Sequence, residues 1–143
     1  MMQNAVITIK GTQTADGDSD TVELVTRGRF GRRDGDWLLC YEENESSGMN
    51  GVQTQIHVRQ DGTVTVKRSG AAESRLVIAK GQKNICFYPA PQGSLALEVF
   101  GESVENGLTE TGGRLFVRYT LSSEGRQISW NTVEIRAVRQ EEP

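Results

Sequence analysis

Residues 52–69 decide the fold most clearly, and they read VQTQIHVRQDGTVTVKRS. Every second residue from Val52 to Val58 is Val, Thr or Ile, and the alternation returns beyond Asp61-Gly62. Successive side chains of a β-strand point to opposite faces, so each run predicts a strand with one buried face. An Asp-Gly pair favours the positive φ angles that a tight hairpin turn requires. The stretch therefore predicts two antiparallel strands joined by a two-residue connection.

The same pattern of short strands separated by turn residues extends along the chain in both directions. Turn-forming pairs such as Asp34-Gly35 and Asn106-Gly107 recur at a spacing of roughly 8–12 residues. The runs between them are rich in Val, Ile, Thr, Leu and aromatic residues, which is typical of an antiparallel sandwich or barrel. Closing a sheet on itself removes its exposed edges. We predict an all-β fold, an antiparallel β-barrel of about 8–10 strands with essentially no helix.

The predicted strands cover roughly residues 4–13, 20–31, 36–45, 52–60, 63–69, 74–79, 84–88, 94–100, 103–110, 114–122 and 126–138. Within the last strand the apolar residues change phase, because Ile128 and Trp130 are even-numbered whereas Val133 is odd-numbered. A shift of one residue moves side chains to the opposite face, so it predicts a β-bulge near Asn131-Thr132.

Length and composition indicate one domain and restrict its partners. The 143 residues suit a single β-barrel domain (1–143), with a core over about residues 4–138 and a short disordered C-terminal tail. The formal net charge is −3 and Lys and Arg form no long block, so no nucleic-acid partner is predicted. The sequence contains neither a signal-peptide pattern nor a long apolar run, so we expect no membrane association. Cys40 and Cys86 are far apart, and we expect two reduced thiols in a cytoplasmic protein.

Two charged residues end otherwise apolar faces. Glu43 shares its predicted face with Leu39 and Tyr41, and Arg68 shares its face with Val66. An isolated charge inside a barrel is costly, so each residue needs the other or water. Three interpretations stay open. Arg68 receives an anionic ligand that Glu43 orients, the two residues form a structural ion pair, or both emerge into solvent where the strands end.

Three tyrosines complete the candidate site. Each either presents its hydroxyl group to a cavity or is a core residue whose hydroxyl finds a partner at a barrel end. The predicted ligand-binding residues are Glu43, Arg68, Tyr41, Tyr88 and Tyr119. We predict no catalytic residue, no metal site and no cofactor. His57, the single histidine, is expected on the solvent face without an acidic partner, and the two cysteines are scattered.

The order of these elements resembles known barrel families. Gly35-Asp36-Trp37 is similar to the short Gly-x-Trp signature of lipocalins, in which the tryptophan plugs one end of the barrel. The chain resembles the YwiB family, small uncharacterised bacterial proteins with a lipocalin-like (calycin-type) β-barrel. The similar elements are Thr26-Arg27-Gly28, Tyr41-Glu42-Glu43, Val66-Lys67-Arg68-Ser69-Gly70, Tyr88-Pro89-Ala90-Pro91-Gln92-Gly93 and Val117-Arg118-Tyr119-Thr120-Leu121. The resemblance implies a closed or nearly closed barrel and no activity, since a fold alone confers none.

The residues leave three functions open. The first is the binding of a small ligand, an anion in one version, at the barrel mouth. The alternative is a packed-core protein–protein interaction module without a small-molecule ligand, whose partner is another protein or a second copy of the chain. The third is an enzyme built on Glu43 and Arg68, for which the sequence displays the least chemistry. Bulky residues that we expect to point inward favour a packed interior. They are Trp37, Leu39, Tyr41, Ile56, Phe87, Leu97, Leu115, Val117 and Tyr119.

Overall fold

The computed structural model describes residues 2–43, 50–71, 73–90 and 93–140. Within these residues the chain forms strands and connecting turns, and no helix. The strands are β1 (Met2–Ala15), β2 (Asp18–Arg33), β3 (Asp36–Glu42), β4 (Val52–Val58), β5 (Val64–Gly70), β6 (Ser74–Ile78), β7 (Lys83–Ala90), β8 (Gly93–Thr109), β9 (Gly112–Ser123) and β10 (Arg126–Arg139). Residues 44 and 45 of the predicted third strand lie outside the described residues.

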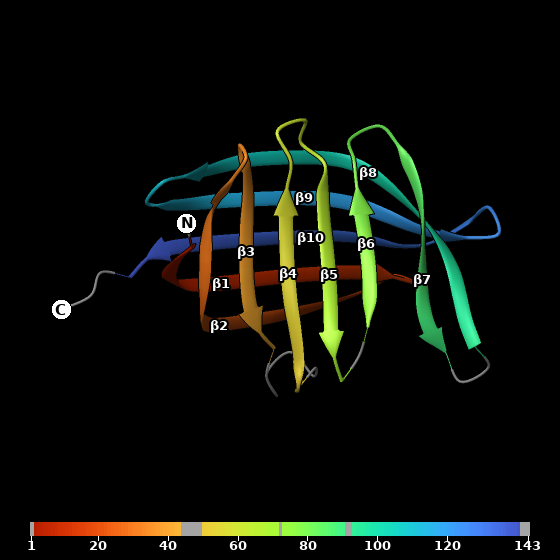
Figure 1. Cartoon of the computed structure of the whole chain (residues 1–143). Helices are drawn as coiled ribbons and strands as arrows, with labels where there is room; N and C mark the ends of the chain where they lie inside the picture. The colour runs from red at the N-terminus through yellow and green to blue at the C-terminus, as the bar shows by residue number, and fades with distance from the viewer. Residues whose placement is uncertain (1, 44–49, 72, 91–92, 141–143) are drawn as a thin grey trace.

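The strands form one antiparallel sheet in the order β6-β5-β4-β3-β2-β1-β10-β9-β8-β7. Figure 1 shows β3 to β6 crossing β1 and β8 to β10 at a steep angle, so the sheet folds over into two layers. The long strand β2 belongs to both layers, because most of it pairs with β1 and its end pairs with β3. The side chains between the two layers make up the interior.

Backbone contacts between the β6–β7 turn and β8 bring the ends of the sheet together. Lys80 forms an isolated bridge with Gly101, Gly81 N donates to Gly101 O over 2.8 Å, and Gly101 N donates to Gln82 O over 3.2 Å. A β-carbon at Gly101 would collide with the carbonyl oxygen of Ala79, so this close approach requires glycine. The barrel is therefore nearly closed, and the predicted all-β antiparallel barrel is confirmed. Its lipocalin-like or calycin-type grouping stays a prediction.

Alternate side chains of both layers meet in one apolar core. Leu39 on β3, Ile56 on β4 and Leu115 on β9 are almost completely buried, as the alternation in their strands predicts. Trp37 is also buried, and its ring stacks on Phe30 with 6.4 Å between the ring centroids. Removal of this apolar surface from water is the main favourable contribution to folding.

The predicted hairpin between β4 and β5 is confirmed, but its predicted two-residue connection is wrong. Arg59 N donates to Thr63 O and Gly62 N donates to Arg59 O, so the loop consists of Gln60, Asp61 and Gly62. Gly62 has a φ of 91°, the left-handed conformation that ends a three-residue hairpin loop.

Another difference concerns β8, which runs without a break where we predicted separate strands over 94–100 and 103–110. The pairing of β8 with β9 shifts between Gly101 and Ser103, at the place where the β6–β7 turn meets the strand. The predicted gap is therefore a local irregularity in one long strand.

The predicted bulge of the last strand is wrong in position. The register of β10 against β9 shifts between Gln127 and Ser129, and it is continuous at Asn131. Ser129 and Asn131 consequently point inward and are buried, whereas Ile128 and Trp130 are exposed on the outer surface. An earlier bulge moves the change of face toward the start of the strand.

The expected inward position of Phe87 is also wrong. Phe87 is 61% exposed, because its neighbour Cys86 takes the inward, buried position on β7. Leu97, which lies opposite Cys86 on β8, is buried as predicted.

At the C-terminal end, the predicted disorder is wrong for Arg139 and Gln140. Strand β10 continues through Arg139, and Gln140 N donates to the carbonyl oxygen of Asn4 over 2.9 Å. Residues 141–143 lie outside the described residues. Within the described residues, we find no helix with the length and apolar character needed to cross a membrane.

Candidate functional site

Three neighbouring strands place polar side chains, among them two of the predicted ligand-binding residues, in one row on the inner face of the sheet. Tyr41 on β3 lies opposite Thr54 on β4, and Thr54 lies opposite Arg68 on β5. Directly opposite residues of antiparallel strands point to the same face with about 4.5–5.5 Å between their Cα atoms. The row is therefore a consequence of register, and each strand supplies one polar group to it.

Gly28 on β2 continues this row and lies opposite Tyr41. A β-carbon at Gly28 would lie 2.5 Å from Cys40 O, 2.6 Å from Ile7 Cδ1 and 3.1 Å from Tyr41 Cβ. These distances leave no space for a side chain. The glycine therefore lets β2 and β3 approach with the Tyr41 side chain in its observed place.

Glu43 follows Tyr41 by two residues and points to the same inner face. Its backbone N–H donates to Val52 O over 2.8 Å, which extends the pairing of the chain after β3 with β4. The Glu43 residue is only 6% exposed, and its Oε1 accepts a hydrogen bond from Thr54 Oγ1 over 3.0 Å. A buried carboxylate is thus held by a neutral hydroxyl donor.

One oxygen of Glu43 and one nitrogen of Arg68 have no such partner. Among the described residues, Glu43 Oε2 and Arg68 Nε are buried side-chain atoms without a hydrogen bond. Glu43 and Arg68 form no ion pair within 4.0 Å in the same part of the chain. Buried polar atoms are rarely left unpaired, because each costs about 1–3 kcal/mol. The barrel therefore presents one acceptor and one donor that no group of the described residues satisfies.

Both residues line a cavity of about 180 Å³ inside the barrel. Its other walls are mainly aliphatic, and they include Ile9, Leu24, Ile56, Leu76, Val117 and Ile135. Side chains from both layers of the sheet form these walls. The cavity has an apolar body and a polar end at Glu43, Arg68 and Tyr41.

The apolar surroundings shift the pKa of Tyr41. Burial raises the pKa of Tyr41 well above its ordinary value, and the Glu43 carboxylate raises it further. Arg68 and Thr54 act on the same pKa in the opposite direction but do not reverse it. The Tyr41 phenol therefore stays protonated at physiological pH and keeps its O–H donor.

Among the predicted site residues, Tyr41, Glu43, Arg68 and Tyr119 line this single cavity. Tyr119 reaches it from β9, in the layer opposite Tyr41, and both tyrosines are buried. Tyr88 lies on β7 opposite Leu95, and its side chain lies outside the described part of the structure.

Thr54 was not among the predicted site residues, although it is the hydroxyl donor to Glu43. Its even number places it on the same predicted inner face as Ile56, and a polar residue on an apolar face was the available signal. Gly28 gives no comparable signal, because its role depends on how closely β2 approaches β3.

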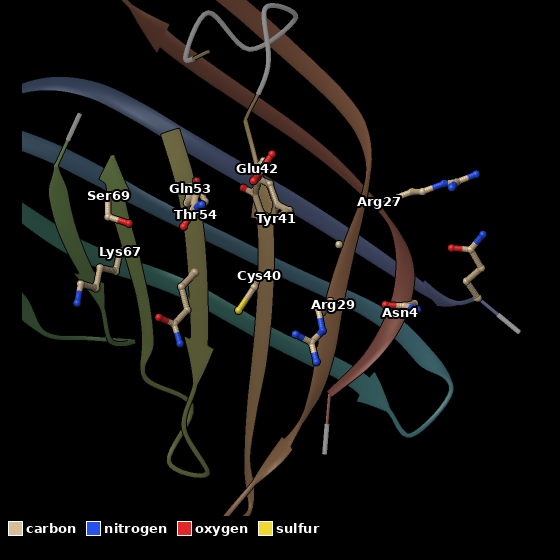
Figure 2. Close-up of a pocket in the computed structure, with 13 residues that line it drawn as sticks. Asn4, Arg27, Arg29, Cys40, Tyr41, Glu42, Gln53, Thr54, Lys67 and Ser69 are labelled. Carbon is tan, nitrogen blue, oxygen red and sulfur yellow. The ribbon is translucent and has the colours of Figure 1, made fainter. Parts of the chain in front are cut away.

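A larger hollow lies on the outer surface of the same strands. It has a volume of about 780 Å³ and is open to solvent, and Figure 2 shows it over β2 to β5, with Cys40 and Arg29 between Lys67 and Asn4. Most of the residues that line it are polar, among them Arg27, Arg29 and Lys67. Thr54 and Tyr41 also line it, and Tyr41 lines the inner cavity as well, so β3 and β4 separate this outer groove from the inner cavity.

The expectation that His57 has no acidic partner is wrong. His57 Nε2 lies 2.8 Å from Asp36 Oδ2, and the two side chains are about one-third and one-quarter exposed. The hydrogen bond from His57 lowers the pKa of Asp36 below its ordinary value. This pair lies on the outer side of the barrel, away from the inner cavity, because His57 alternates with the inward residues Ile56 and Val58.

Comparison with known proteins identifies relatives of the same fold. A family model described as a domain of unknown function, DUF1934, matches residues 7–135. The uncharacterized β-barrel protein YwiB of Bacillus subtilis (strain 168) is 29% identical over 123 residues, which cover 85% of this chain and 84% of YwiB. The crystal structure of the ywiB protein from Bacillus subtilis matches with a TM-score of 0.84 and 22% identity, over 98% of this chain and 94% of that one. The predicted resemblance to the YwiB family and the barrel that it implies are confirmed.

Proposed function

This chain belongs to the DUF1934 family, and we propose that its barrel binds one small, uncharged molecule in the cavity between Glu43 and Arg68. One observation carries the proposal. Glu43 Oε2 and Arg68 Nε are both buried without a partner among the described residues, and both residues line a cavity whose other walls are mainly aliphatic. A ligand with a donor and an acceptor at one end satisfies both atoms at once.

The size of the cavity restricts the ligand to a few atoms. An apolar cavity of about 150 Å³ holds one benzene molecule. The 180 Å³ available here therefore suits about seven non-hydrogen atoms, fewer than a drug-sized ligand has. A branched aliphatic skeleton matches the Leu, Ile and Val side chains that line the walls.

The charges at the polar end favour a neutral ligand over an anion. The formal charges of Glu43 and Arg68 cancel, and the other described residues that line the cavity are uncharged. A carboxylate placed near Arg68 would also face Glu43, which repels it in an apolar interior. A primary amide or an alcohol donates to Glu43 and accepts from Arg68 without adding charge.

Four molecules with one carbon skeleton test the proposal. Isovaleramide, isoamyl alcohol, isovalerate and isoamylamine differ in their head groups, and their affinities are measured by calorimetric titration at neutral pH. We expect the amide and the alcohol to bind at least about tenfold more tightly than the two ions, because burying an unpaired charge is costly. If none of the four binds, the proposed cavity function is wrong, and if isovalerate binds best, the ligand is an anion.

A matched pair of variants localises the binding. Val133→Phe places a ring in the cavity, because Val133 lines it and packs against the core. Val138→Phe places the same ring on the outer surface of the same strand, where Val138 is 63% exposed. We expect the first variant to abolish binding and the second to retain it, with circular dichroism to verify that both fold.

A further inference from the structure

The outer groove has a regular arrangement that the inner cavity does not explain. One cross-strand row runs along the groove and continues past it. Arg29, Cys40, Gln55 and Lys67 line the groove and lie opposite one another on β2, β3, β4 and β5, and Arg75 on β6, opposite Lys67, lines the neighbouring hollow. All five therefore point to the outer face. Figure 2 shows Arg29, Cys40 and Lys67 along the groove.

Positive charge is concentrated on this face. Arg27, Arg29 and Lys67 line the groove, and Glu42 is the acidic residue in its lining. A neighbouring hollow shares Gln55 and Lys67 with it and adds Arg75 and Arg59. This basic face belongs to a chain with a formal net charge of −3, so the charge is segregated and is not a property of the whole surface.

These cations are available to a partner. Arg27, Arg29 and Lys67 are exposed, and none of them forms an ion pair within the described residues. The other lining groups are mostly amides and hydroxyls, among them Gln53, Gln55 and Ser69, which both donate and accept hydrogen bonds.

From these features we infer that the outer groove is a docking site for an extended, acidic segment of a partner protein. Neighbouring strands are about 4.8 Å apart, so the row from Arg29 to Arg75 spans about 19 Å. An extended chain advances about 3.3 Å per residue, and about six residues therefore cross it. Acidic side chains on one face of such a segment meet the cations, while its backbone reaches the glutamines between them.

The groove suits an acidic protein segment better than a single-stranded nucleic acid. Nucleic-acid grooves combine positive charge with exposed aromatic rings on which bases stack. Tyr41 is the aromatic residue in the lining, and it is buried. The exposed rings of Phe87, Phe100 and Trp130 lie on β7, β8 and β10, outside the groove.

Two capped octapeptides test the inference, one of alternating Glu and Ser and one of alternating Gln and Ser. We expect the Glu peptide to bind in a calorimetric titration, the Gln peptide to fail, and added salt to weaken binding because exposed charges are screened. Replacement of Arg29 and Lys67 by Gln should weaken binding about tenfold, since two exposed ion pairs are lost. The matched variant Lys83→Gln/Arg126→Gln removes two exposed cations elsewhere and should bind as tightly as the original protein.

Cys40 supplies a second readout that locates the peptide. Cys40 is half-buried and lines the groove, whereas Cys86 is buried inside the barrel. We expect the Glu peptide to slow alkylation of Cys40 by iodoacetamide, measured residue by residue with mass spectrometry, and to leave Cys86 unaffected.

Four results would overturn the inference. The first result is that the Glu peptide does not bind, and the second is that it binds the Arg29→Gln/Lys67→Gln variant as tightly as the original protein. The third result is that an octamer of deoxythymidine binds more tightly than the peptide and protects Cys40, which would assign the groove to nucleic acid. The fourth result is that sedimentation shows a dimer that the Arg29→Gln/Lys67→Gln variant loses, which would assign the groove to a second copy of the chain. None of these results depends on whether the inner cavity binds a ligand.

Discussion

Thr54 Oγ1 donates a 3.0 Å hydrogen bond to Glu43 Oε1 and so satisfies one of the two oxygens of a carboxylate that is only 6% exposed. The other oxygen has no partner among the described residues. Glu43 is therefore held in position on one side and left able to accept a further hydrogen bond on the other. The proposed ligand occupies that second position.

Thr54→Val tests the hydroxyl donor with little change of shape. The variant leaves a buried carboxylate oxygen without a partner, and we expect the free energy of unfolding to fall by about 1–3 kcal/mol. Urea denaturation measures the change. Thr54→Ser retains the hydroxyl and should lose less, and equal losses for both variants would contradict the role of the hydrogen bond.

Glu43 and Arg68 should be energetically coupled through the polar end of the cavity. A double-mutant cycle with Glu43→Gln and Arg68→Gln separates their interaction from their individual effects. We expect a coupling energy of about 0.5–3 kcal/mol, with the double variant more stable than the single effects add up to, because each single change leaves one charge uncompensated. Additive losses in urea denaturation would show that the two groups do not interact.

Alkaline pH should destabilise the barrel through Tyr41. The folded-state pKa of Tyr41 is raised by burial and by Glu43, so the unfolded chain loses this proton first, at its ordinary pKa near 10. The contribution is therefore intact below about pH 10, and stability falls above it by up to about 1.4 kcal/mol per pH unit.

Tyr41→Phe is the control for this pH dependence. The variant removes the ionisable group, so its unfolding free energy should decrease less steeply above pH 10 than that of the original protein. Parallel curves for the two proteins in urea denaturation from pH 8 to 11 would mean that Tyr41 does not cause the loss.

Gly28→Ala should destabilise the barrel, because its new β-carbon meets Cys40, Ile7 and Tyr41 at 2.5–3.1 Å. We expect a loss of about 1–3 kcal/mol from overpacking. Gly11→Ala is the matched control, since a β-carbon at Gly11 has no heavy atom within 4 Å. That variant should stay within about 0.5 kcal/mol of the original stability, and thermal unfolding of both variants decides the comparison.

The alternation of side chains along each strand correctly predicted which residues of β3, β4 and β5 face the interior. Tyr41, Glu43 and Arg68 are found where alternation places them, because a short strand without a bulge preserves its phase from end to end. The loop between β4 and β5 differs by one residue from its prediction, and the faces still agree because each strand carries its own apolar pattern.

The alternation of side chains gives the wrong face where the register of a strand changes. Trp130 is exposed because the bulge precedes Ser129, and an apolar residue beside a bulge does not reveal its position. The cavity itself depends on how the two layers curve around each other. Tyr119 and Tyr41 come from opposite layers, and no local pattern states the distance between them.

The most direct test of the central claim is the position of isovaleramide in the barrel, measured by intermolecular nuclear Overhauser effects in solution. The account predicts contacts from the ligand methyl groups to the methyl groups of Val117 and Ile56, which line the cavity. Contacts to the exposed residues Val25 and Val138 in their place, or no contacts at saturating ligand, would contradict it.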